Sequence, residues 1–120
     1  MIDPRIFQNL RLVGGFTVVH VENAKQPLID ALGREAIART AIIGRDFYIT
    51  IRSGLTDEEL SVTLYHELLE AMTVASDNPP ESVRMLNEGD FERAAYRAHD
   101  ELGEASPATI DRMLQSYGFR

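Results

Sequence analysis

The segment 56–80 constrains the fold of this chain more than any other part of the sequence. Thr56 followed by Glu59 is a capping box, in which each side chain accepts a backbone N–H at the start of a helix. The helix continues through the run LSVTLYHELLEAMTVAS and is expected to end near the two prolines that close the segment, because proline lacks the N–H that a helix interior needs. Leucines, alanines, Tyr65 and Met72 form a broad apolar face, so we expect this helix to lie against the core.

The rest of the first half of the chain predicts strands with one helix between them. Residues 16–22 are β-branched and aromatic and follow two glycines, which favours a strand. Residues 41–43 and 47–51 flank a short loop that contains glycine, which favours a hairpin. Between these strands, apolar residues at helical spacing after a proline predict a helix over residues 27–39.

The second half of the chain is expected to be helical. A short helix over residues 81–87 should be broken by Gly89, and another helix should cover about 90–103. Ser106 followed by proline is typical of a helix start, and this last helix should end at Gly118.

Length, composition and charge limit the classes of protein to which the chain can belong. Its 120 residues fit a single domain, residues 1–120, of the α+β class, with a small antiparallel or mixed sheet packed on the long helix and a helical C-terminal half. The formal net charge of −7 argues against partners such as nucleic acid or an anionic membrane. The absence of cysteine excludes disulfides and thiolate ligands. Neither a signal peptide nor an apolar run of membrane-spanning length is found, so we expect a cytoplasmic protein.

A polar stripe runs along the long helix opposite its leucines. Residues three or four positions apart share one face of a helix, and here they are Glu59, Thr63, His66, Glu70, Thr73 and Asp77. His66 and Glu70 are one turn apart, about 5–6 Å between Cβ atoms, and Glu67 lies at the edge of the stripe. Two ligands one turn apart can bind one metal ion, and a neighbouring carboxylate can accept a proton from a bound water.

The segment FYITIRSGLTDEELSVTLYHELLEA resembles the strand, turn and active-site helix of the zincin-like metallopeptidases, whose helix carries the motif HExxH. The resemblance covers roughly residues 40–75 and implies a zincin-like fold that acts on a peptide or protein substrate. It further implies that His66 is a zinc ligand, that Glu67 is the general base, and that the strand 47–51 lines the substrate cleft. Here Glu70 replaces the second histidine of the motif, and a glutamate at this position also suits other divalent cations such as Mg²⁺, Ca²⁺ or Mn²⁺.

No motif identifies a third metal ligand. Asp77 follows the end of the long helix, where a turn could bring it back to the site. Glu92, Tyr96 and His99 share one face of the helix expected over residues 90–103. By the same resemblance, Glu92 corresponds to the downstream glutamate ligand of the gluzincins, whereas His99 would restore a second nitrogen donor, and these alternatives stay open.

Two functions follow from these observations. The first is a divergent metal-dependent hydrolase, a peptidase with an HExxE site that holds zinc or another divalent cation. The alternative is a catalytically inactive zincin-like domain, in which His66 and Glu70 are an exposed pair worth about 0.3–0.5 kcal/mol. Such a domain would work as a binding module or a homodimer, and the apolar positions of the last helix offer a pairing surface. These positions are Ile110, Met113, Leu114 and Tyr117.

Overall fold

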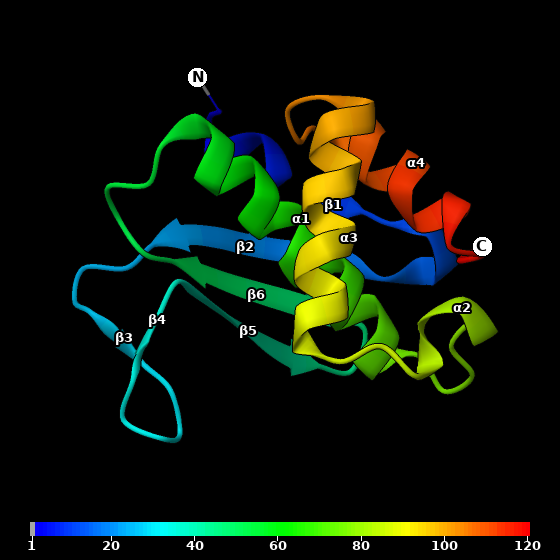
Figure 1. The fold of residues 1–120 in the computed structure, drawn as a ribbon, viewed down its shortest axis with the longest axis horizontal. Coiled ribbons are helices and arrows are strands. Elements are labelled where there is room, and N and C mark those ends of the chain that lie inside the picture. The colour runs from blue at the N-terminus through cyan, green and yellow to red at the C-terminus, as the bar shows by residue number, and fades with distance from the viewer. Residues whose placement is uncertain (1) are drawn as a thin grey trace.

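The computed structural model describes residues 2–120 and places a mixed β-sheet against a long helix (Figure 1). The strands of this sheet lie in the order β1–β2–β6–β5; β2 and β6 are parallel, and the outer pairs are antiparallel. Their bounds are Leu10–Arg11 (β1), Thr17–Asn23 (β2), Ala38–Ile43 (β5) and Asp46–Ile51 (β6). The predictions of an α+β fold, of the strand near 16–22 and of the hairpin are confirmed.

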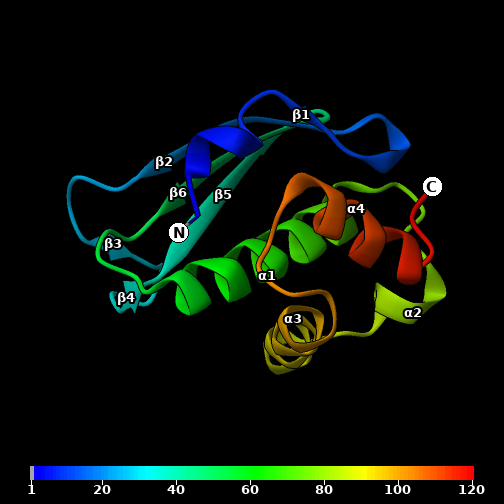
Figure 2. The ribbon, with the colours of Figure 1, turned by 90° about the horizontal axis from the view of Figure 1, so that it is seen from above.

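The helices follow the strands in the chain and cover one face of the sheet. Figure 2 shows α1 between the sheet and α3, and α4 beside α1 near the C-terminus. Their bounds are Asp57–Ala75 (α1), Glu81–Arg84 (α2), Glu88–Leu102 (α3) and Pro107–Ser116 (α4), and 3-10 turns cover Pro4–Phe7 and Val13–Gly15. Within residues 2–120, none of the helices has the length and apolar character needed to cross a bilayer.

The helix α1 begins and ends as the sequence predicts. The hydroxyl of Thr56 accepts the N–H of Glu59 at 3.1 Å, and the carboxylate of Glu59 accepts the N–H of Thr56 at 3.0 Å. The predicted core positions Tyr65 and Met72 are buried together with three leucines of the helix, Leu64, Leu68 and Leu69. Because burial of one leucine-sized side chain contributes about 1.5–3 kcal/mol, packing of this face stabilises the helix far more than propensity does.

The prediction of a helix over residues 27–39 is wrong, because this segment forms a hairpin that leads into β5. The carboxylate of Asp30 accepts the N–H groups of Leu32 and Arg34 at 2.8 and 2.9 Å. Gly33 has a φ of +78°, in the left-handed region that favours glycine, so the chain reverses here instead of continuing as a helix. The strands of the hairpin are Leu28–Ile29 (β3) and Glu35–Ala36 (β4).

The predicted break at Gly89 is also wrong. The side chain of Asn87 accepts the N–H of Asp90 at 2.9 Å, and the carboxylate of Asp90 accepts the N–H of Asn87 at 3.0 Å. This second capping box starts α3 at Glu88, so Gly89 lies inside the first turn of the helix. The short helix before it ends at Arg84, earlier than expected.

The apolar face of α4 does not form the pairing surface that the sequence suggested. Ile110, Met113 and Leu114 are at most 1% exposed and belong to the core, and Tyr117 packs against that core. Ser106 caps the helix as predicted. These side chains therefore hold α4 on the rest of the chain and are unavailable for a homodimer contact.

Candidate metal centre

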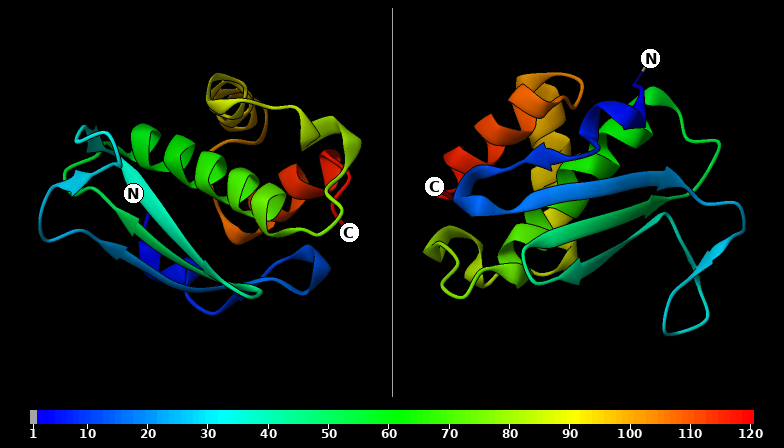
Figure 3. Two further views of the ribbon diagram at one scale, coloured as in Figure 1. Left: turned by 90° about the horizontal axis from the view of Figure 1, so that it is seen from below. Right: turned by 180° about the vertical axis from the view of Figure 1, so that it is seen from behind.

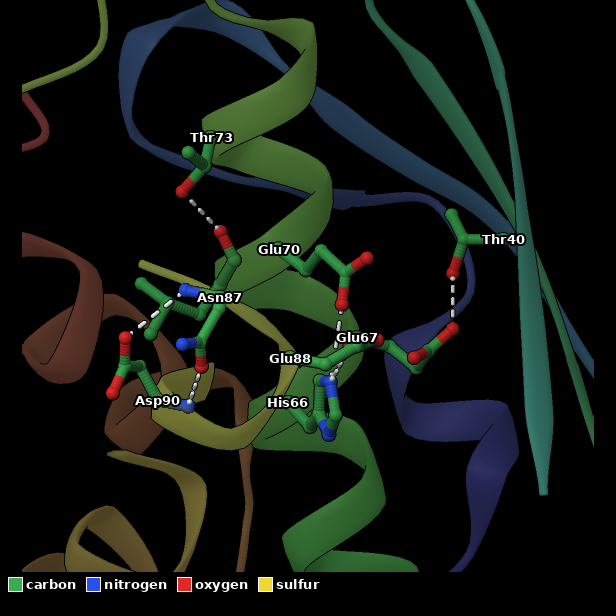
Figure 4. Close-up of polar contacts among 9 residues, drawn as sticks. Thr40, His66, Glu67, Glu70, Thr73, Asn87, Glu88 and Asp90 are labelled. Atoms are coloured by element: carbon green, nitrogen blue, oxygen red, sulfur yellow. Dashed lines mark hydrogen bonds and ion pairs between the residues drawn. The ribbon is translucent and has the colours of Figure 1, made fainter. Parts of the chain in front are cut away.

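Three side chains of α1 that the sequence analysis singled out form a compact group. One ligand atom from each of His66, Glu67 and Glu70 lies within 4.8 Å of the other two. The Nε2 atom of His66 is 3.0 Å from an oxygen of Glu70, the contact drawn in Figure 4. The spacing of one helical turn produces this contact directly, since residues i and i+4 lie above one another on a helix.

A fourth side chain, Glu88, reaches the group from the first turn of α3, and the sequence analysis missed it. Its Oε2 atom is 3.4 Å from the Nε2 atom of His66. The signal that could have identified it is the capping box of Asn87 and Asp90, which places residue 88 in the first turn of a helix. Because of Glu88, the imidazole nitrogen faces carboxylates from two different helices.

The three candidates for a third ligand lie elsewhere. Glu92 is one turn after Glu88 and lines the same cleft, but it is outside the compact group that the described residues form. The Nδ1 atom of His99 lies 2.8 Å from the hydroxyl of Ser61, so this histidine has its own partner. Asp77 lines a separate cavity near the C-terminal end of α1. The structure therefore brings none of the three to the group around His66.

The ring of His66 is held by an aromatic side chain of α3. It stacks on Phe91 with 6.4 Å between ring centroids and 19° between the planes, and Phe91 is itself buried. Only 21% of the His66 side chain is exposed. Stacking fixes the plane of the imidazole, so Nε2 stays directed at the carboxylates.

Glu67 is tied to the sheet by a hydrogen bond. The hydroxyl of Thr40 in β5 donates to Oε1 of Glu67 at 2.9 Å (Figure 4). The expectation that the strand 47–51 lines the cleft is wrong, because β6 lies between β2 and β5 and none of its residues lines the cleft. The edge strand is β5, whose Ala38 lines the cleft and whose Thr40 contacts the glutamate of α1.

Burial and mutual repulsion shift the pKa values of this group. Burial alone lowers the pKa of His66, but the hydrogen bond to Glu70 and the charges of the neighbouring glutamates outweigh it, so the pKa lies above its ordinary value. Burial raises the pKa of Glu67, although the hydrogen bond from Thr40 opposes this. The pKa of Glu88 is raised by burial and then by the charge of Glu70, whose own pKa is lowered by its hydrogen bond with His66. A divalent cation would relieve this crowding of negative charge.

The group opens into a cleft of about 520 Å³. One wall is formed by β4 and the start of β5, the opposite wall by α3, and α1 forms the floor. His66, Glu67 and Glu88 all line this cleft. Its volume lies within the range of roughly 300–1,000 Å³ that is usual for ligand sites in proteins.

No protein-family model, curated protein or solved structure matches this chain. The side chains that face the cleft are therefore the observations from which a function can be inferred.

Proposed function

We propose that this protein is a metal-dependent peptidase of zincin-like architecture, with α1 as its HExxE helix. One observation carries the proposal: Nε2 of His66 faces oxygens of Glu70 at 3.0 Å and of Glu88 at 3.4 Å, and both His66 and Glu88 line a cleft beside an edge strand. Three protein ligands that leave one coordination position open are the usual composition of a catalytic zinc site. The segment that resembles the zincin-like metallopeptidases contains two of these ligands.

The proposed ligands are one imidazole and two carboxylates. Imidazole suits zinc, whereas carboxylates also suit harder ions such as Mn²⁺, so zinc or another divalent cation fits this set. When bound, such an ion supplies Lewis acidity and lowers the pKa of a water molecule. Because the pKa of His66 is raised in the metal-free protein, binding requires loss of a proton and becomes tighter as the pH rises.

Glu67 is assigned the role of general base. Thr40 holds one of its carboxylate oxygens at 2.9 Å, and burial raises its pKa, which favours proton transfer near neutral pH. Its carboxylate accepts a proton from the attacking water, and the remaining hydroxide adds to the carbonyl carbon of the peptide bond. The same proton is then given to the leaving nitrogen as the C–N bond breaks, so one water is consumed for each bond cleaved.

Metal binding by ligand variants tests this proposal. We expect wild-type protein dialysed against Zn²⁺ or Mn²⁺ to retain about one equivalent by elemental analysis. Glu70→Gln and Glu88→Gln should each weaken binding by at least about tenfold, the lower limit for loss of supporting groups around a metal. The matched control is Glu92→Gln, which changes the same kind of side chain one turn further along α3 and should leave the affinity unchanged.

Wild-type protein that retains neither ion would contradict the metal centre. The alternative, an inactive zincin-like domain that acts by association with another protein, would then be favoured. Retention of metal by Glu88→Gln with wild-type affinity would instead remove only that residue from the ligand set.

A further inference from the structure

The cleft contains more negative charge than a metal centre requires. Among the residues 2–120, its walls carry six carboxyl groups and neither lysine nor arginine. Two of these groups, Glu67 and Glu88, belong to the proposed centre. The other four are Asp30, Glu35, Glu59 and Glu92.

Two of the four additional carboxylates already have partners. Asp30 is paired with Arg34 at 3.1 Å, and the carboxylate of Glu59 accepts a backbone N–H in the cap of α1. Within the described chain, by contrast, neither Glu35 nor Glu92 takes part in a salt bridge. They lie on opposite walls, one on β4 and the other on α3, so a cation between them is attracted from both sides.

The cleft also presents apolar surface between these charges. Ile37 and Tyr96 line it and are 48% and 49% exposed, and Val62 of α1 contributes to the floor. Lysine and arginine have an apolar stem and a charged head, and aromatic faces attract cations. A wall that combines Tyr96 with Glu92 therefore matches both parts of a basic side chain.

The edge strand β5 offers a position at which the backbone of an extended peptide can bind. The β3–β4 hairpin extends beyond the sheet and leads into β5, as Figures 1 and 3 show. Ala38 lines the cleft, and Thr40, two residues further along β5, contacts Glu67. Two residues of a strand span about 6–7 Å. In a peptide paired with β5, a basic side chain bound beside Ala38 would therefore lie within one or two residues of the bond to be cut next to Glu67. An extended segment can pair with such an edge.

We propose that the cleft selects extended peptide segments that carry lysine or arginine, with the basic side chain between Glu35 and Glu92 and next to Tyr96. This selectivity rests on the proposed function, because the cleft is the one that contains the proposed metal centre. Anionic segments are excluded by repulsion from the same carboxylates.

Binding of two labelled peptides to the full chain tests the selectivity. The peptides have equal length, and one alternates alanine with lysine while the other alternates alanine with glutamate. Fluorescence anisotropy is measured with the Glu67→Gln protein, so that turnover does not interfere, in the presence and absence of Zn²⁺. We expect the lysine peptide to bind roughly tenfold or more tightly than the glutamate peptide.

Two double variants with the same change in net charge distinguish binding in the cleft from general attraction to an acidic protein. The double variant Glu35→Lys, Glu92→Lys should lose the preference for the lysine peptide. The control double variant Glu101→Lys, Glu104→Lys changes the net charge equally at exposed positions outside this cleft and should keep it. If both double variants weaken lysine-peptide binding equally, general attraction to an acidic protein explains the binding and the inference is overturned.

The proposed metal centre and the proposed peptide selectivity can be contradicted independently of each other. Equal affinity for both peptides in protein that binds zinc would overturn the selectivity alone. A lysine preference that depends on Glu35 and Glu92 in protein that binds neither Zn²⁺ nor Mn²⁺ would support the selectivity of the cleft and contradict the metal centre.

Discussion

His66 and His99 both link α1 to α3 through one ring nitrogen, but the charge around them differs. The Nε2 atom of His66 faces the carboxylates of Glu70 and Glu88. The Nδ1 atom of His99 faces the neutral hydroxyl of Ser61 at 2.8 Å. The contact partners of His66 are therefore charged, whereas the contact partner of His99 is neutral.

The Nδ1 atom of His99 belongs to a short hydrogen-bond chain through Ser61 to the backbone of Ala105. Ser61 is fully buried, and its hydroxyl accepts the N–H of Ala105 at 2.8 Å, which leaves its hydrogen free for donation to the imidazole of His99. Around His66, several carboxylates share one imidazole, and either protonation of these groups or an added cation can offset their charge. His99 thus has a neutral, buried partner and is expected to be structural, whereas the group of His66, Glu67 and Glu70 could hold a metal ion.

The largest expected effect is on the peptidase activity proposed for the His66 region. Glu67→Gln keeps the size of the side chain and an oxygen that can accept the Thr40 hydrogen bond, but it removes the proposed base. Peptide hydrolysis should fall by roughly 10²–10⁴-fold while the metal content is retained. Steady-state assays with matched elemental analysis measure both quantities. Unchanged turnover in a metal-loaded variant would exclude Glu67 as the base.

The largest effect in the His99 region should be on stability. Ser61→Ala leaves the N–H of Ala105 and a nitrogen of His99 without their partner, at a cost of about 1–3 kcal/mol in the free energy of unfolding. Urea denaturation measures this cost, and metal affinity should not change. Thr63→Ala is the control, because its hydroxyl bonds only to a carbonyl of its own helix; it should cost less than about 0.5 kcal/mol. Equal costs for the two variants would argue against a structural role for His99.

A smaller effect is expected at the contact between the edge strand and α1. Thr40→Val keeps the shape of the side chain but removes the hydrogen bond to Glu67, a net contribution of about 0.5–1.5 kcal/mol. The value of kcat should fall by up to roughly tenfold with little change in KM. Thr40→Ser restores the donor and should restore the rate. If Thr40→Ser is as slow as Thr40→Val, loss of packing rather than of the hydrogen bond explains the defect.

The smallest effect is the pH dependence of the metal-free protein. Because the folded-state pKa of His66 is raised above 6.5, its ion pairing stabilises the fold below the unfolded pKa and is lost as the pH rises through the folded pKa. The pair with Glu70 contributes about 0.3–0.5 kcal/mol. An NMR titration should show a midpoint above 6.5 that falls in Glu70→Gln but not in Glu92→Gln. A wild-type midpoint below 6.5 would contradict the electrostatic description of this cluster.

The elements that the sequence predicts well are those that local contacts define. The cap at Thr56, the cap at Ser106 and the antiparallel hairpin of β5 and β6 involve residues close together in the chain. The pair His66 and Glu70 belongs to the same class, because helical periodicity alone places them one turn apart. Together with Glu67, they make up three of the four side chains in the candidate site, and the fourth is Glu88.

The errors arise where local patterns compete or where packing decides. Apolar spacing over residues 27–39 is helical, but Gly33 and the turn at Asp30 produce a separate two-stranded hairpin, which β5 of the main sheet follows in the chain. Gly89 predicted a break between two helices. The capping box at Asn87 instead starts α3 before this glycine, so Gly89 lies in the first turn of the helix. The side-chain hydrogen bonds of Asp30 outweighed the apolar pattern in the first place, and those of Asn87 and Asp90 outweighed the glycine in the second.

By itself, the sequence determined where α1 lies and which of its residues share a face, because backbone hydrogen bonds and caps act over a few residues. The tertiary structure decided which other groups meet that face: Thr40 from the edge strand and Glu88 from the next helix. It also decided that the apolar side of α4 is buried in the core. These contacts join residues that are distant in the chain, and they follow from how the sheet and helices pack rather than from any local spacing.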